Sequence, residues 1–176
     1  MSSMRISTVE SNFGPITLGA SQRGLAMLHF GTDVPPWARR YFKEIVQDAW
    51  AVQPFADNLA RYFETGDIPD LPFDLRGTDF QVRCWQYLCA IPKGETRTYL
   101  QLARAVATEK TVRAVGQANG ANPVAIFVPC HRVIASDGTL GGYGGGLPMK
   151  AALLDLEGAT YKVRRAPASL FEAAGA

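Results

Sequence analysis

A cysteine, a histidine and an arginine stand next to one another in the segment 128–133, Val-Pro-Cys-His-Arg-Val. The segment follows an apolar run at 124–128 and precedes a loop of mostly small residues at 135–146. A free thiol has a pKa of about 8.5 and is mostly protonated at neutral pH, so a nucleophilic cysteine needs a nearby base or a positive charge. His131 and Arg132 supply both types of group, which makes Cys130 the first candidate for a reactive residue.

Strand geometry limits direct contact between Cys130 and His131. The apolar run predicts that Cys130 continues a buried strand, and adjacent residues of a strand point to opposite faces. His131 would therefore act on the thiol through a water molecule, and a third group would have to hold its other ring nitrogen. Among the acidic residues that follow, Glu157 has the most suitable place, at the end of a predicted helix. The other acidic residues downstream are Asp137, Asp155 and Glu172. Without such neighbours, a cysteine in a strand is more often a small core residue than a nucleophile.

The composition argues against several kinds of protein. With 176 residues, 47% of them apolar, the chain is long enough for one ordinary domain or two small ones. No apolar stretch has the length of a membrane span and the N-terminus lacks the pattern of a signal peptide, so the expected location is the cytoplasm, with no membrane partner. Cys84, Cys89 and Cys130 fit neither a disulfide framework nor a zinc site, and His29 and His131 are isolated from any ligand pair. We therefore expect reduced cysteines, no metal and no cofactor.

The charge is unevenly distributed along the chain. Residues 1–80 carry 7 Lys and Arg against 10 Asp and Glu, a net charge of −3, whereas residues 81–165 carry 11 against 5, a net charge of +6. The second part is the candidate for meeting a polyanion such as nucleic acid. A mildly basic solvated face explains the charge equally well.

The first part of the chain predicts a small antiparallel sheet followed by helices. Residues 4–30 contain short strand-like runs with turn signals between them. Two stretches with helical spacing follow, at 37–50 and 55–65. The segment 66–77 contains Gly and Pro at several positions and is typical of a connector.

This connector divides the chain into an N-terminal α/β domain at 1–75 and a C-terminal domain at 76–165. A loosely ordered tail is expected at 166–176. The predicted fold class is α/β, of the α+β kind, with the sheet in the first domain and most of the helices in the second.

A helix-turn-helix pattern is predicted in the basic part. Thr78 or Asp79 can cap a helix that runs to about residue 90. Two further helices, at 99–106 and 112–119, have apolar or small residues at i, i+3, i+4 and i+7, with a short turn between them. Helix pairs are also common in protein cores, so the spacing alone leaves a DNA-binding and a purely structural interpretation open. Arg113 projects away from the apolar stripe of the second helix, beside small residues that would let this helix approach a groove.

A glycine-rich loop and a last helix complete this part. The loop 138–146 lacks the Gly-Lys-Ser/Thr ending of a phosphate-binding loop. Its glycines would instead let backbone N–H groups approach a flat ligand, and a flexible surface loop is the alternative. The last helix is expected at 148–156, with Pro148 in its first turn.

Together, these motifs resemble those of the 6-O-alkylguanine-DNA alkyltransferases, the methylated-DNA–protein-cysteine methyltransferases of direct DNA repair. The similarity is dense from Arg76 to Gly158 and weaker over the N-terminal sheet. It implies a ribonuclease H-like N-terminal domain and a mostly helical, winged-helix-like C-terminal domain with the helix-turn-helix. The motifs are Arg-Gly-Thr-Asp-Phe-Gln at 76–81, Ile-Pro-Lys-Gly-Glu-Thr at 91–96, Arg-Ala-Val-Gly at 113–116, Asn-Pro at 122–123, Pro-Cys-His-Arg-Val at 129–133, Gly-Gly-Tyr at 141–143 and Glu-Gly at 157–158.

The resemblance implies a role for each of five catalytic residues. Cys130 would accept the alkyl group, His131 would be the base acting through a water, and Glu157 would orient His131, in a relay that raises the thiolate fraction. Tyr99 would donate to ring nitrogen 3 of the damaged guanine, and Asn122 would support the turn before the cysteine. The residues implied to bind the damaged base are Val133, Tyr143, Gly144 and Gly145.

The resemblance also implies that the partner is alkylated double-stranded DNA. The damaged nucleotide must leave the base stack before a buried thiol can reach it, and Arg113 would fill the space it leaves. The residues implied to contact DNA, through the minor groove, are Val112, Arg113, Ala114, Gly116 and Arg132. The product, a thioether, has no route back to a thiol, so each molecule would act once. The family pattern implies 6-O-methylguanine as substrate, with 4-O-methylthymine as a second one, and a monomer without an obligate protein partner.

Three other functions fit parts of the sequence. A non-enzymatic lesion-binding protein of the alkyltransferase-like kind would lack the acceptor cysteine, which is present here. A cysteine hydrolase would need an oxyanion hole and would turn over an acyl substrate. A helix-turn-helix regulator would bind one DNA sequence and would not need Cys130.

Overall fold

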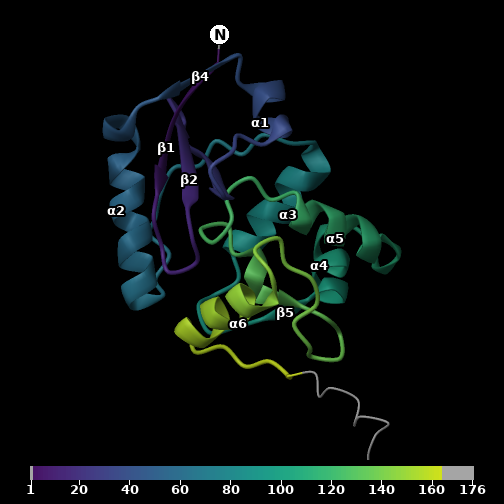
Figure 1. Ribbon diagram of the computed structural model, residues 1–176. Helices are drawn as coiled ribbons and strands as arrows, with labels where there is room; N and C mark the ends of the chain where they lie inside the picture. Colours follow the sequence, from purple (N-terminus) through teal and green to yellow (C-terminus); the bar gives the residue numbers. More distant parts are fainter. Residues whose placement is uncertain (1, 164–176) are drawn as a thin grey trace, which may run out of the picture.

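The N-terminal part of the molecule is a four-stranded sheet with a long helix beside it. The computed structural model describes residues 2–163. The strands β1 (Ser3–Val9), β2 (Ile16–Ser21), β3 (Gly24–Phe30) and β4 (Glu44–Gln47) lie in the order β3-β2-β1-β4. The pairs β1/β2 and β2/β3 are antiparallel, as predicted, whereas β4 pairs with β1 in parallel. Figure 1 shows α2 (Ala49–Thr65) beside this sheet and the later helices on the other side of the molecule.

The prediction of a helix at 37–50 is wrong after residue 41. The structure has a short helix, α1 (Pro36–Tyr41), then the edge strand β4, and only then the start of α2. The chain becomes extended at Phe42, and the β-branched pair Ile45 and Val46 aligns with β1. Helical spacing alone did not reveal that this segment completes the edge of a sheet.

The two faces of the sheet pack against different partners. Met4, Ile6 and Met27 form a small cluster with Ala38 and Phe42 of the α1 region. The opposite face belongs to a larger cluster that includes residues of α2 and of the second half of the chain. Its sheet and α2 members include Ile16, Leu18, Leu28, Val52 and Leu59, and its later members include Trp85, Leu102, Val115 and Leu153. The two halves of the chain therefore share one apolar core.

Two helices of the second half begin with complete capping boxes. Thr78 accepts from the backbone N–H of Gln81 at the start of α3 (Asp79–Cys89), and the Gln81 side chain accepts from the Thr78 backbone. Thr98 and Gln101 form the same arrangement at the start of α4 (Tyr99–Val106). A short 3-10 turn, η1 (Glu109–Thr111), leads to α5 (Val112–Gly120). The helix pair predicted from spacing is thus present as α4 and α5.

The segment before Cys130 is not the predicted buried strand. Among the described residues, its one strand-like pairing is an isolated β-bridge between Val124 and Leu28. Its backbone turns at Ile126, which has a positive φ of 72°. A β-branched residue in this conformation is strained, so the surrounding hydrogen bonds must hold it. Cys130 itself begins the 3-10 turn η2 (Cys130–Arg132), which is followed by β6 (Val133–Ile134), paired in parallel with β5 (Arg97–Thr98). The last helix, α6 (Leu147–Leu156), agrees with the prediction.

Two segments from later in the chain form backbone hydrogen bonds with β3 at the edge that faces away from β2. Leu25 exchanges backbone hydrogen bonds with the connector, donating to Pro72 and accepting from Asp74. Leu28 does the same with the segment before the cysteine, donating to Pro123 and accepting from Ala125. The N-terminal sheet therefore supports both the connector and the site, and the division at residue 75 remains a prediction.

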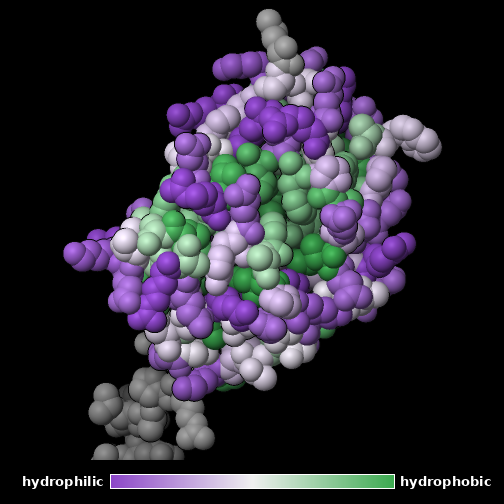
Figure 2. Space-filling view, turned by 180° about the vertical axis from the view of Figure 1, so that it is seen from behind, coloured by the Kyte–Doolittle hydropathy of each residue, from purple (hydrophilic) through white to green (hydrophobic). Residues whose placement is uncertain are grey.

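Hydrophilic residues form most of the outline of the molecule. Figure 2 shows hydrophobic side chains mainly in the middle of the face seen from behind, with hydrophilic ones around them. Large apolar side chains that are exposed include Trp50 and Leu147. Within residues 2–163, no helix is long and apolar enough to cross a membrane, and no cluster of three potential metal ligands occurs. The predicted tail at 166–176 lies outside the described residues.

Candidate active site

Cys130 is held at the end of an irregular segment by three sets of hydrogen bonds. Its backbone N–H donates to Val128 over 2.7 Å, and its carbonyl accepts from the Asn119 side chain over 3.3 Å. Asn122 donates to the Val128 carbonyl over 2.7 Å and accepts from the Val124 N–H over 3.0 Å. One side chain thus spans the strained turn at both ends, which places Asn122 in a supporting position before the cysteine.

Cys130 is one of the residues that line a cavity of about 760 Å³. The thiol-bearing residue is only 5% exposed, so access to it runs through this cavity. The walls come from both halves of the chain. They include Leu28, Phe30, Trp37 and Arg40 on the N-terminal side, and Tyr99, Gly116, Asn119, Asn122, Tyr143 and Gly144 on the other. A volume of this size is typical of sites for small molecules or for a single base.

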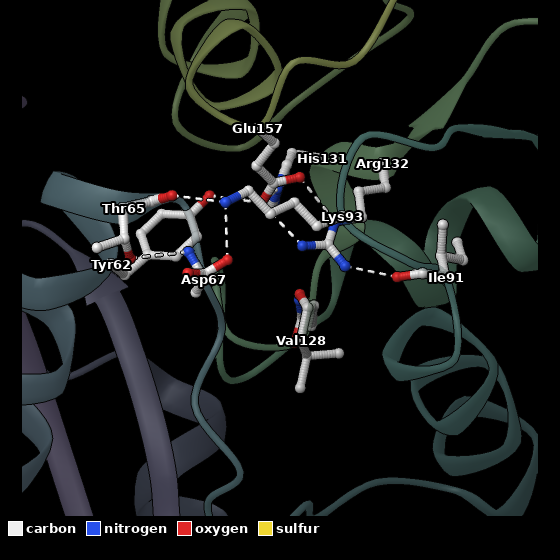
Figure 3. A network of polar contacts seen from close by, with 10 residues as sticks. Tyr62, Thr65, Asp67, Ile91, Lys93, Val128, His131, Arg132 and Glu157 are labelled. Carbon is white, nitrogen blue, oxygen red and sulfur yellow. Dashed lines mark hydrogen bonds and ion pairs between the residues drawn. The ribbon is translucent and has the colours of Figure 1, made fainter.

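His131, the residue after the cysteine, forms a buried pair with Glu157 (Figure 3). The His131 Nε2 lies 2.9 Å from Glu157 Oε1, and both side chains are fully inaccessible to solvent. Arg132 completes the network by donating to both carboxylate oxygens, from Nε to Oε2 over 2.7 Å and from Nη2 to Oε1 over 2.9 Å. The other ring nitrogen of His131, Nδ1, has no hydrogen-bond partner among the described protein atoms. The pair can therefore fix the orientation of the ring and leave Nδ1 available for another group.

The buried network keeps Glu157 ionised and His131 neutral. Burial opposes ionisation of Glu157, but hydrogen bonds from His131 and Arg132 outweigh it and lower the pKa of the carboxyl group to about 2. Burial also lowers the pKa of His131 below its ordinary 6.5, against the opposite influence of Glu157. A neutral imidazole is able to accept a proton, as a general base must.

Burial favours the protonated form of the resting Cys130 thiol. Burial raises the pKa of Cys130, while Asn122 and the nearby charge of Lys150 act in the opposite direction. Lys150 is itself fully buried, and its ammonium group donates to the carbonyls of Val133, Leu140 and Gly142. Burial lowers the pKa of Lys150 to about 8. Proton removal from Cys130 must therefore accompany the reaction.

Arg132 does not face outward, so its assignment to DNA contact is corrected. Its guanidinium is inside the protein, where it binds Glu157 twice and donates to the Ile91 carbonyl. The residue is only 4% exposed. Because η2 replaces the predicted strand, Arg132 turns inward towards Glu157 and is unavailable to a ligand at the surface.

The residues predicted to bind the base occupy different places around the cavity. Tyr99, Tyr143 and Gly144 line it, and the Tyr143 ring lies 6.0 Å from the Phe30 ring of β3, between centroids. Gly145 is not among the lining residues, and it is closely packed, since a Cβ there would lie 2.5 Å from Met149 Sδ and 3.0 Å from the Phe30 ring. Val133 is buried in β6 and its carbonyl accepts from Lys150.

The helix α5, which lines part of the cavity, carries an exposed cation beside small residues. Arg113 is exposed and makes no hydrogen bond or ion pair with any residue of the described chain. Val112 is 36% exposed, and Ala114 is half-buried. Gly116 lines the cavity, and a Cβ added there would lie 4.0 Å from the Tyr99 ring. Arg113 and its small neighbours therefore lie on the same helix as Gly116, which lines the cavity that also contains Cys130.

Sequence reasoning missed two buried polar residues of the site. Lys150 had a detectable signal, because it stands three and four residues before Leu153 and Leu154, on the inner stripe of the predicted helix. Tyr62, in α2, donates to Glu157 Oε1 over 2.7 Å from 95 positions away along the chain. No local pattern could reveal that contact.

The fold and the site together define a class of protein: an α/β protein with a helix pair above a cavity that ends at a buried thiol, backed by a His–Glu pair. Residues 79–159 match the family model described as "6-O-methylguanine DNA methyltransferase, DNA binding domain". This range contains every site residue of the second half, from α3 to Glu157.

Relatives extend the match over nearly the whole chain. A methylated-DNA–protein-cysteine methyltransferase of Mycobacterium tuberculosis is 44% identical over 165 residues, which cover 93% of this chain and 94% of the relative. The protein of that name from Methanosarcina barkeri is 41% identical, with 85% and 94% covered. A crystal structure of the Mycobacterium tuberculosis OGT in complex with DNA superimposes with a TM-score of 0.78 at 42% identity, covering 88% of this chain and 92% of that one. The chain therefore belongs to the methylated-DNA–protein-cysteine methyltransferase family, and the resemblance found in its sequence is confirmed.

Proposed function

We propose that this protein repairs DNA by moving the alkyl group of 6-O-methylguanine in duplex DNA to the sulfur of Cys130. The observation that carries the proposal is the buried thiol at the end of a cavity, backed by the His131–Glu157 pair. The M. tuberculosis relative that is 44% identical bears the name of this activity. A solved M. tuberculosis structure at 42% identity contains DNA.

The transfer is a substitution at a saturated carbon. The Cys130 thiol loses its proton through a water molecule to His131 Nδ1, which has no protein partner among the described residues. The sulfur then forms a bond to the methyl carbon while the bond from this carbon to guanine oxygen 6 breaks. The departing guanine takes a proton at ring nitrogen 3 from Tyr99, and the proton that His131 took from the thiol returns through water to the Tyr99 oxygen, so one proton passes in net from sulfur to the repaired base. Glu157 holds the His131 ring throughout, and the charge of Lys150 favours the thiolate as it forms.

The damaged base would occupy the cavity between the two halves of the chain. Tyr143 and the Gly144 backbone would face the base and its alkylated oxygen, since both line the cavity. Val133 and Gly145 would act through the backbone of the loop and of β6. Asn122 keeps the turn before Cys130 in shape, which fixes the sulfur relative to the base.

The helix α5 would open the duplex from the minor groove. Moving a base out of the stack costs about a few kcal/mol, less for a damaged pair. Arg113 would fill the vacated space, and the small residues Ala114 and Gly116, with Val112, would allow close approach to the narrow groove. Phosphate contacts would supply affinity without sequence preference.

Several finer features belong to the same proposal. The thioether product is stable, so each molecule acts once, and 4-O-methylthymine is the second expected substrate. The protein would act as a monomer on duplex DNA, with no cofactor and no obligate protein partner. We assign the sheet with α2 to a ribonuclease H-like domain, and the helical part, including α4 and α5, to a winged-helix-like domain.

The proposal is tested by the mass of the intact protein after mixing with duplex DNA that contains one 6-O-methylguanine. We expect a single methyl group on Cys130, in amounts that match the protein, and no adduct in Cys130→Ser. A protein that gains no methyl group, or a Cys130→Ser variant that still does, contradicts the proposal. Continued turnover of an activated ester by the wild type would favour a cysteine hydrolase instead.

A further inference from the structure

Tyr62 reaches the site from the opposite half of the molecule (Figure 3). Its side chain is fully buried in α2, and its hydroxyl donates to Glu157 Oε1 over 2.7 Å. The same oxygen accepts from Arg132 Nη2 and contacts His131 Nε2, each over 2.9 Å. The oxygen that orients the His131 ring is thus also held by a residue of the N-terminal half.

The packing around Tyr62 leaves its hydroxyl little freedom. The ring lies edge-on against Phe127, with centroids 6.2 Å apart and planes at 86°, in the segment that leads to Cys130. Lys93 binds the C-terminal end of α2, because its ammonium group donates to the Thr65 carbonyl over 2.6 Å and to Asp67 over 2.7 Å. A Cβ at Gly66, the residue after the helix, would lie 3.0 Å from the Leu156 carbonyl, so α2 and the end of α6 meet closely.

The hydroxyl group is a permanent donor to the carboxylate. Burial and the adjacent charge of Glu157 raise the pKa of Tyr62 far above the physiological range. A donor on Oε1 draws electron density from the oxygen that the His131 N–H faces. The carboxylate then stabilises a protonated imidazole less, and His131 becomes a weaker base. Tyr62 therefore has two separable effects, on the orientation of Glu157 and on the basicity of His131.

We propose that Tyr62 is a positioning residue for alkyl transfer, which holds Glu157 Oε1 from the N-terminal half and thereby sets both the orientation and the basicity of His131. The inference rests on the proposed function and adds a residue to its relay. An ordinary buried tyrosine that merely needs a hydrogen-bond acceptor would affect stability alone.

The test compares Tyr62→Phe with the wild type and with Tyr161→Phe. Tyr161 is a matched control, because its hydroxyl also donates to a carboxylate, Asp155 over 3.1 Å, at an exposed position. The rate of Cys130 methylation is measured in single-turnover experiments from about pH 5 to about pH 9. We expect Tyr62→Phe to react on the order of tenfold more slowly, with the acid limb of its pH–rate profile at higher pH, because His131 is then more basic. Tyr161→Phe should match the wild type throughout.

Two results would overturn the inference. One is a Tyr62→Phe profile that equals that of the wild type, and the other is a rate that falls by the same factor at every pH with no movement of the acid limb. If Tyr62→Phe does not fold, 3-fluorotyrosine at position 62 keeps the ring and donates more strongly, so its acid limb must move to lower pH. An unmoved limb in this variant also overturns the inference.

Failure of the proposed function would look different. A wild-type protein that forms no methyl adduct refutes the function, and the ¹⁵N NMR titration of His131 in wild type and Tyr62→Phe then tests the inference alone. A higher His131 pKa in the variant supports it, and an unchanged one refutes it.

Discussion

Glu157 makes hydrogen bonds or ion pairs with three buried residues of the site. It accepts from Tyr62 and Arg132, contacts His131, and stays ionised inside the protein, because His131 and Arg132 lower its pKa to about 2 against the effect of burial. A buried carboxylate of this kind contributes to stability only while its partners are complete.

We expect Glu157→Gln to lower the free energy of unfolding by about 3–5 kcal/mol near neutral pH, because the buried Arg132 loses its counter-charge. Because the pKa of folded Glu157 lies below the ordinary 4.5, its contribution is complete above about pH 4.5 and is lost as the pH falls towards 2. We expect urea unfolding between about pH 7 and about pH 2.5 to show that the difference in unfolding free energy between wild type and variant becomes smaller as the pH falls.

Glu95→Gln is the matched control, because Glu95 pairs with Arg97 at a position where its side chain is 51% exposed. Its cost should stay at or below about 1 kcal/mol. A Glu157→Gln variant no less stable than this control would contradict the buried network.

Sequence reasoning went furthest for residues with distinctive neighbours. Cys130, His131 and Glu157 could be connected because few acidic residues follow the cysteine. Lys150 and Tyr62 were missed, since burial decides their roles and burial depends on segments far away in the chain. Arg132 was assigned to DNA contact through the resemblance, whereas the 3-10 turn at this point of the backbone and the bonds to Glu157 keep its side chain inside the protein.

At the scale of elements, the side chain of Asn122 stabilises the turn in the segment 122–129. Asn122 bridges Val124 and Val128 across the strained residue Ile126. We expect Asn122→Ala to lower the free energy of unfolding by roughly 1–3 kcal/mol, because the buried N–H of Val124 loses its acceptor and the Val128 carbonyl keeps only the Cys130 N–H as donor. Urea unfolding and the rate of Cys130 methylation measure the two consequences, and the rate should fall as well.

Asn58→Ala in α2 serves as the comparison, because the half-buried Asn58 side chain donates to the Pro54 carbonyl of its own helix. Its stability should stay within about 0.5 kcal/mol of the wild type. Equal effects of the two substitutions would show that the turn does not need Asn122.

A second prediction at the scale of elements concerns Arg113 in the helix α5. If Arg113 replaces the flipped nucleotide, Arg113→Ala should slow methylation from duplex DNA by about tenfold or more, since flipping costs a few kcal/mol. A single-stranded oligonucleotide with the same lesion needs no replacement of a stacked partner, so the rate on it should change little. Arg61→Ala, an exposed arginine of α2, should alter neither rate. Equal slowing of Arg113→Ala on both substrates would count against this role.

Helix ends were easier to predict than strands. The capping residue Thr78, the helix pair and the start of the last helix could be read locally, because caps and spacing are short-range signals. The strand β4 could not, since its partner β1 lies some 40 positions away and only pairing makes it a strand.

For the whole molecule, the shared core predicts one cooperative unfolding transition. The cluster around Trp85 includes residues of β2, β3 and α2, and β3 donates backbone hydrogen bonds to both later segments. With Trp37 and Trp50 replaced by Phe, the fluorescence of Trp85 should report the same urea midpoint as far-UV circular dichroism. Two separate midpoints would mean that the predicted domains at 1–75 and 76–165 unfold independently.

The burial of the thiol has a consequence for how the protein survives until it is needed. Cys130 is enclosed and protonated, whereas Cys89 lies at the surface. Small electrophiles and oxidants dissolved in the medium attack thiolates, so they meet an unreactive group at Cys130. A protein that can react only once is thereby protected from alkylation or oxidation by the wrong reagent. Because the thiol is shielded, it becomes reactive only when a damaged base enters the cavity.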